Sequence, residues 1–177
     1  VALLLTATNL AIADYKTTIY TPNGTAVEAK VKDEAPEKIA SWNEDAQEYI
    51  DSMNLTAVIV DDSSRTYNCH AYGWYLFNTS YSRVWLNQPH WHAFVDDESY
   101  IPCTTQEPNP PHASRVVYAY ADHSAVNWAT SPHTFLSKWG SLPLVWHLPG
   151  DDPYYMGVED PEPNDPITGF TYYCPNY

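Results

Sequence analysis

The stretch RTYNCHAYGW, residues 65–74, determines how the rest of the chain is interpreted. Cys69 stands between Asn68 and His70, and the aromatic residues that follow predict a short helix over residues 69–77. A cysteine that opens a helix has two interpretations. It is a nucleophile, because a helix N-terminus stabilises a thiolate, or it is half of a structural disulfide.

The cysteine count leaves both interpretations open. The chain has three cysteines, Cys69, Cys103 and Cys174. In an oxidising compartment an odd count predicts one disulfide and one remaining thiol. Cys69 can pair with Cys103 or with Cys174, or it can stay outside the bridge.

Composition and short motifs indicate where the protein is located and which classes of partner are disfavoured. The 177 residues carry a net charge of −14, which disfavours nucleic acids and anionic membrane surfaces as ligands. Asn23, Asn54 and Asn78 each begin an N-glycosylation acceptor sequence, so we expect N-linked glycans. Together these features predict a secreted glycoprotein at an extracellular or cell-surface location.

The first residues, VALLLTATNLAIA, form an apolar segment over residues 1–13. Its end resembles a signal-peptide cleavage site, and it is shorter than the roughly 20 residues that a membrane-spanning helix needs. As a retained strand, it packs on its own domain or inserts into a neighbouring subunit by strand addition. Its apolar residues fall on both faces of such a strand. The predicted assembly residues are Leu3, Leu4, Leu5, Leu10 and Ile12.

The remaining pattern predicts an α+β fold. We expect a hairpin over residues 14–34 and an amphipathic helix over 36–51. The expected strands cover residues 55–60, 82–86, 116–121, 123–129, 134–140, 142–148 and 169–174. The chain divides into an apolar arm (1–13), a hairpin with a helix (14–55) and a main domain (56–177) with a Pro- and Asp-rich tail.

A histidine at the start of a sheet strand completes a pattern of chemical interest. His123 follows the helix of Cys69 and opens one strand of the expected antiparallel meander. Thiol hydrolases use a cysteine at a helix start and a histidine that acts as base and then as acid. The order of the elements allows Cys69 and His123 to meet.

Six segments resemble one family. They are YNCHAYGW (67–74), VW (84–85), DESY (97–100), VVYAYADHSAV (116–126), LSKWGSLPLVWH (136–147) and PYY (153–155). In this order they resemble secreted, mostly uncharacterised bacterial domains of the papain-like superfamily, which includes cell-wall amidases and endopeptidases. The resemblance covers residues 66–155 and implies a papain-like antiparallel sheet packed on the short helix that carries Cys69.

The resemblance also implies roles for single residues. Cys69 becomes the nucleophile, His123 the base and His147 the orienting group, with Ser137 as an alternative to His147. That interpretation leaves Cys69 as a thiol and pairs Cys103 with Cys174, which fits the odd cysteine count.

We expect no metal ion and no cofactor. His90 and His92 place two imidazoles on one side of an expected strand, but no third ligand stands at a zinc-site spacing. The acidic residues between 151 and 165 do not follow the spacing of a calcium-binding EF-hand loop.

Two functions follow from these features. The first is a structural subunit of an extracellular, N-glycosylated filament or surface polymer, in which homo-oligomers join through residues 1–13. The alternative is a secreted papain-like amide hydrolase that uses Cys69 and His123. The assembly function accounts for the apolar arm and is the one we favour from the sequence.

Overall fold

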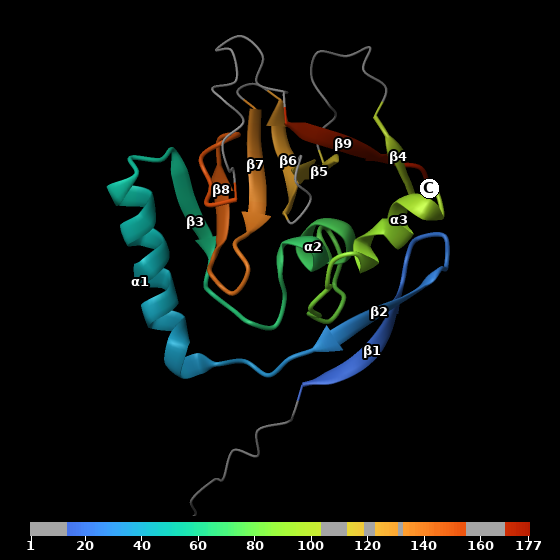
Figure 1. Cartoon of the computed structure of the whole chain (residues 1–177), viewed down its shortest axis with the longest axis horizontal. Coiled ribbons are helices and arrows are strands. Elements are labelled where there is room, and N and C mark those ends of the chain that lie inside the picture. The colour runs from blue at the N-terminus through green and yellow to red at the C-terminus, as the bar shows by residue number, and fades with distance from the viewer. Residues whose placement is uncertain (1–13, 104–112, 119–122, 131–132, 155–168) are drawn as a thin grey trace, which may run out of the picture.

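A computed structural model describes residues 14–103, 113–118, 123–130, 133–154 and 169–177. The apolar arm, with Leu3, Leu4, Leu5, Leu10 and Ile12, lies outside the described residues, as does the acidic segment 155–168. The described part is α+β: two antiparallel sheets combined with one long helix and several short ones (Figure 1).

The N-terminal segment forms the predicted hairpin and helix. Strands β1 (Tyr15–Tyr20) and β2 (Ala26–Val31) pair antiparallel, and Gly24 in their turn has a φ of 90°, which favours glycine. Helix α1 (Pro36–Ser52) begins with proline, which lacks the N–H that would have no helical partner there. Glu37 in the first turn complements the helix dipole.

The main sheet has seven strands in the order β3-β8-β7-β6-β5-β9-β4, and every neighbouring pair is antiparallel. Their bounds are β3 (Ala57–Asp61), β4 (Tyr100–Pro102), β5 (Arg115–Tyr118), β6 (Ser124–Thr130), β7 (His133–Lys138), β8 (Leu144–His147) and β9 (Phe170–Pro175). The meander from β5 to β8 is confirmed. The C-terminal strand β9 lies between β5 and β4, which the sequence order alone does not indicate.

Short helices connect β3 to β4. Helix α2 (Cys69–Ala71) continues into the π-helical turn η1 (Tyr72–Leu76), so the helix predicted over residues 69–77 is present. The 3-10 turn η2 (His90–His92) and helix α3 (Ala93–Asp96) follow. The strand expected over residues 82–86 is wrong, because Trp85 makes only an isolated bridge with Lys30. The strand expected around residue 90 is also wrong, since His90 N–H donates to Asn87 O in the bond of a tight turn.

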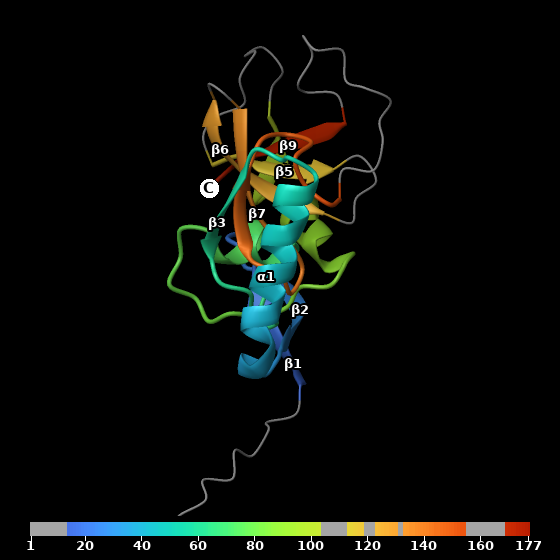
Figure 2. The same ribbon diagram turned by 90° about the vertical axis from the view of Figure 1, so that its left-hand side faces the viewer.

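The two helical parts pack on opposite faces of the main sheet. On one face, Phe77 after η1 packs with Val126, Leu136 and Leu144. Val145 adjoins Leu144 and therefore faces the other side, where it packs with Ile50 of α1 and with Trp139. Figure 1 shows α1 running alongside β3, and Figure 2 views the molecule from that side.

An aromatic cluster surrounds Trp74. Its ring stacks on Trp91 with 5.0 Å between ring centroids and meets the edge of Tyr100 at 5.3 Å. Ile19 and Val27 of the hairpin belong to the same buried cluster. The hairpin is therefore part of the core that surrounds the cysteine-bearing helix.

Candidate active site

The start of α2 is held by Asn68. Its Oδ1 accepts the N–H of Ala71 at 3.1 Å, which makes Asn68 the helix N-cap, and it also accepts the N–H of Leu86 at 3.2 Å. Its Nδ2 donates to Leu86 O at 2.9 Å. Cys69, the next residue, is buried and lies outside any disulfide. The NCHAY motif thus places a thiol at a capped helix start.

A hydrogen bond between their neighbours brings the Cys69 and His123 segments together. His70 Nδ1 lies 2.8 Å from Ser124 Oγ, and Trp74 Nε1 donates to the same oxygen at 3.1 Å. Both side chains belong to the helical turn, and Ser124 opens β6. Burial lowers the pKa of His70 to about 4, with a smaller contribution from His92, so the ring is neutral near pH 7.

His123 lies in a closed aromatic environment. Its ring stacks on Tyr154 with centroids 4.1 Å apart, and Tyr118 meets it edge-on at 4.8 Å. The side chain is fully buried, and neither ring nitrogen has a hydrogen-bond partner among the described residues. Burial lowers the pKa of His123 well below its usual value, and His147 and His70 lower it further. His123 is therefore neutral and makes no hydrogen bond to Cys69 in this structure.

The two alternatives for an orienting group, His147 and Ser137, are hydrogen-bonded to each other. Its Nε2 lies 2.8 Å from Ser137 Oγ, and its Nδ1 lies 2.9 Å from Leu148 O and 3.9 Å from Asp152 Oδ2. Burial lowers the pKa of His147, while Asp152 acts in the opposite direction. Both ring nitrogens of His147 thus have partners other than His123.

Lys138 is a buried cation and was not among the site residues predicted from the sequence. It follows Ser137 in the SKWG motif, and its Nζ donates to Ser64 O at 2.9 Å, to Gly140 O at 3.0 Å and to Leu142 O. Burial lowers its pKa to about 7. The three acceptors use all three ammonium protons. This part of the motif connects the loop before α2 to the turn between β7 and β8.

The predicted Cys103–Cys174 disulfide is confirmed, with an S–S distance of 2.03 Å. It connects the residue after β4 to β9, the strand next to β4 in the sheet. The acceptor residues Asn23, Asn54 and Asn78 are all exposed, which a glycan at each requires.

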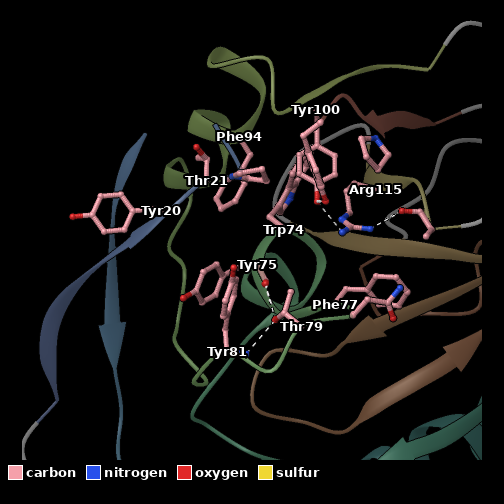
Figure 3. Close-up of a pocket in the computed structure, with 15 residues that line it drawn as sticks. Tyr20, Thr21, Trp74, Tyr75, Phe77, Thr79, Tyr81, Phe94, Tyr100 and Arg115 are labelled. Atoms are coloured by element: carbon pink, nitrogen blue, oxygen red, sulfur yellow. Dashed lines mark hydrogen bonds between the residues drawn. The ribbon is translucent and has the colours of Figure 1, made fainter. Parts of the chain in front are cut away.

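A separate cavity of about 640 Å³ lies between η1 and the β1–β2 turn (Figure 3). Its lining is mainly aromatic, and Arg115 is the cation in it. Cys69 and His123 do not line it. No local pattern in the sequence indicates this cavity, because its residues come from β1, η1, α3, β4, β5 and the C-terminal end.

Comparisons of this chain with known protein families, curated proteins and solved structures found no match. Among the described residues, no helix is long and apolar enough to cross a membrane. No group of three His, Cys, Asp or Glu side chains in that part of the chain is placed to hold a metal ion. His90 instead bonds to the backbone, with Nδ1 2.8 Å from Glu28 O.

Proposed function

We propose that the protein is a structural subunit of an extracellular, N-glycosylated assembly, built on a papain-like domain and joined through residues 1–13. The observation that carries this proposal is the exposure of apolar side chains on β3. Val58 and Val60 are 56% and 55% exposed, on a strand that ends the main sheet.

These valines lie on the face opposite α1. Ala57 and Ile59 alternate with them and pack against the α1 side. The strand register places Val58 beside the partly buried Trp146 of β8. An apolar row on an end strand is the feature that natural sheets protect, because it invites pairing with another chain.

The apolar arm suits this surface chemically. Leu3 and Leu5 alternate with Leu4, so a strand of residues 1–13 offers one apolar face to Val58 and Val60 of a neighbouring subunit. Apolar burial of about 25 cal/mol per Å² must exceed the repulsion between copies of net charge −14. We therefore expect assembly to strengthen when salt screens that repulsion.

The test compares the unaltered protein with three variants by light scattering and analytical ultracentrifugation. Deletion of residues 1–13 and the double substitution Val58→Glu/Val60→Glu should each yield folded monomers. Met53→Glu is the matched control, since Met53 is also an exposed apolar residue (58%) but lies at the end of α1. Unchanged particle size in both the deletion and the Val58→Glu/Val60→Glu variant would refute the proposal.

One specific observation favours a second function, a thiol amide hydrolase. The bond between His70 and Ser124 brings together the segments of Cys69 and His123, whose side chains a thiol amide hydrolase would need within hydrogen-bonding reach. Two features oppose this function, because a base must reach its proton: His123 is buried, and no described residue forms a hydrogen bond to its ring.

Alkylation of the native protein near pH 7 separates the two functions. Fast labelling of Cys69, together with loss of peptide or cell-wall hydrolysis in Cys69→Ala, would establish the hydrolase. Slow labelling that becomes fast only on unfolding is the result we expect, since Cys69 is buried.

A further inference from the structure

We propose that the aromatic cavity around Arg115 is a binding site for a carboxylate carried on a six-membered ring, either an aromatic acid or a uronic acid. This site is separate from the candidate thiol site and from the proposed assembly surface, and it does not depend on either function.

The first observation is a buried cation without a carboxylate partner. Arg115 is 4% exposed, and no described Asp or Glu forms an ion pair with it. An unpaired buried charge is strongly unfavourable unless a ligand or partner compensates it.

The second observation is the hydrogen-bonding capacity that Arg115 retains. One terminal nitrogen donates to Tyr100 Oη at 2.8 Å and the other to Ala113 O at 2.5 Å. A guanidinium has five N–H groups, and these two bonds use only one of the two N–H groups on each terminal nitrogen; the buried Nε also has no hydrogen-bond partner among the described residues. A planar, partly satisfied guanidinium favours a carboxylate, which can accept two parallel hydrogen bonds.

The third observation is the shape and chemistry of the walls. The guanidinium lies 5.1 Å from the ring centre of Phe77 and 4.9 Å from that of Tyr100. Figure 3 shows Trp74, Phe94 and Tyr100 on one side of the cavity and Tyr75 and Tyr81 on another. Tyr75 and Tyr81 stack on each other, with centroids 4.8 Å apart.

The size of the cavity limits the ligand. A volume of about 640 Å³ is in the range of small-molecule sites and fits one or two rings. Aromatic walls pack against aromatic rings and against the apolar faces of sugar rings, while Thr21 and Thr79 add polar groups for hydroxyls. The ligand class is therefore a ring that bears a carboxylate, and the geometry leaves its source open between aromatic and sugar acids.

The experiment is a ligand-observed NMR titration of the full chain with two matched pairs of probes. Benzoate is compared with benzamide, and D-glucuronate with D-glucose. We expect at least one acid to bind about tenfold or more tightly than its neutral partner, because only the acid pairs with the guanidinium. The pair that shows the difference identifies the source, and equal affinities within both pairs would overturn the proposal.

Substitutions test whether the probes bind in the cavity around Arg115. Arg115→Met retains the apolar stem between Phe77 and Tyr100 and should abolish the preference for the acid. Arg115→Lys retains the charge with fewer donors and should keep part of the preference for the acid. Tyr81→Ala, at the rim of the cavity, should weaken the binding of both probes of a pair. Tyr15 is an exposed tyrosine of the hairpin that does not line the cavity, so Tyr15→Ala should weaken the binding of neither probe.

Two controls keep the result interpretable. Thermal melting shows whether Arg115→Met is folded, and the comparison of acid with neutral probe in the unaltered protein needs no variant.

Discussion

His70 Nδ1 and Ser124 Oγ lie 2.8 Å apart, so the residues that directly follow Cys69 and His123 are hydrogen-bonded to each other. The same serine oxygen accepts the indole N–H of Trp74 at 3.1 Å. One small hydroxyl therefore joins the cysteine-bearing helix to the strand that His123 precedes.

Replacement of Ser124 by alanine should lower the free energy of unfolding by about 1–3 kcal/mol. The change leaves His70 Nδ1 and Trp74 Nε1 without the partner they have in the buried interface, and unsatisfied buried polar groups carry that cost. Urea denaturation measures it. Ser41→Ala on the exposed face of α1 is the control, with an expected change within about 0.5 kcal/mol.

The protonation of His70 should make the fold sensitive to mild acid. Burial lowers the pKa of folded His70 to about 4, whereas the unfolded side chain takes up its proton near pH 6.5. The unfolded chain therefore binds more protons between these values, and stability falls as pH falls from 6.5 towards 4. For His70 alone the loss is about 3 kcal/mol.

Comparison with His70→Gln isolates this contribution. Glutamine keeps a polar group near Ser124 but does not titrate, so the variant should lose less stability between pH 6.5 and 4 than the unaltered chain does. Carboxylates that titrate in the same range are common to both proteins and cancel in the difference. Parallel pH curves for the two proteins would contradict the assigned state of His70.

Local patterns in the sequence were sufficient for most of the secondary structure. The helix at residues 36–51 and the β5–β8 meander carry their periodicity and turn residues within a few positions, and both are present. The strand predicted over residues 82–86 was wrong because Trp85 pairs with a single distant residue, Lys30. Alternation of residue types cannot show how far a pairing extends. The place of β9 depends on strand order, which no local pattern contains.

The candidate site was predictable only in part. Cys69 and His123 were found from their positions at element starts, and the disulfide followed from the interpretation of Cys69 as a thiol. Lys138 and Arg115 were missed because basic residues in strands are ordinarily solvent-exposed. Their signal was the neighbouring apolar run, VVYAY after Arg115 and FL shortly before Lys138, which favours a strand buried on both faces.

Replacement of Lys138 by methionine should destabilise the fold by about 2–4 kcal/mol. Methionine fills a similar volume but leaves the carbonyl oxygens of Ser64, Gly140 and Leu142 without their shared donor. Lys16→Met provides the matched control, because Lys16 is exposed and pairs with Glu28 only at the surface. Equal unfolding midpoints for the two variants would show that the buried ammonium contributes no net stability.

Removal of the disulfide should loosen the β4–β9 end of the sheet and lower overall stability. Cys103 and Cys174 are 71 residues apart, and closing a loop of that length in the unfolded chain corresponds to about 4 kcal/mol. Strand β4 has only three residues and pairs with β9, so the bridge stabilises a short edge strand that backbone bonds hold weakly. The double variant Cys103→Ser/Cys174→Ser should therefore unfold at lower urea concentration. Hydrogen exchange should show the fastest added exchange in β4 and β9. Uniformly faster exchange across β6, β7 and β8 would instead show that the bridge acts on the whole fold through the unfolded chain.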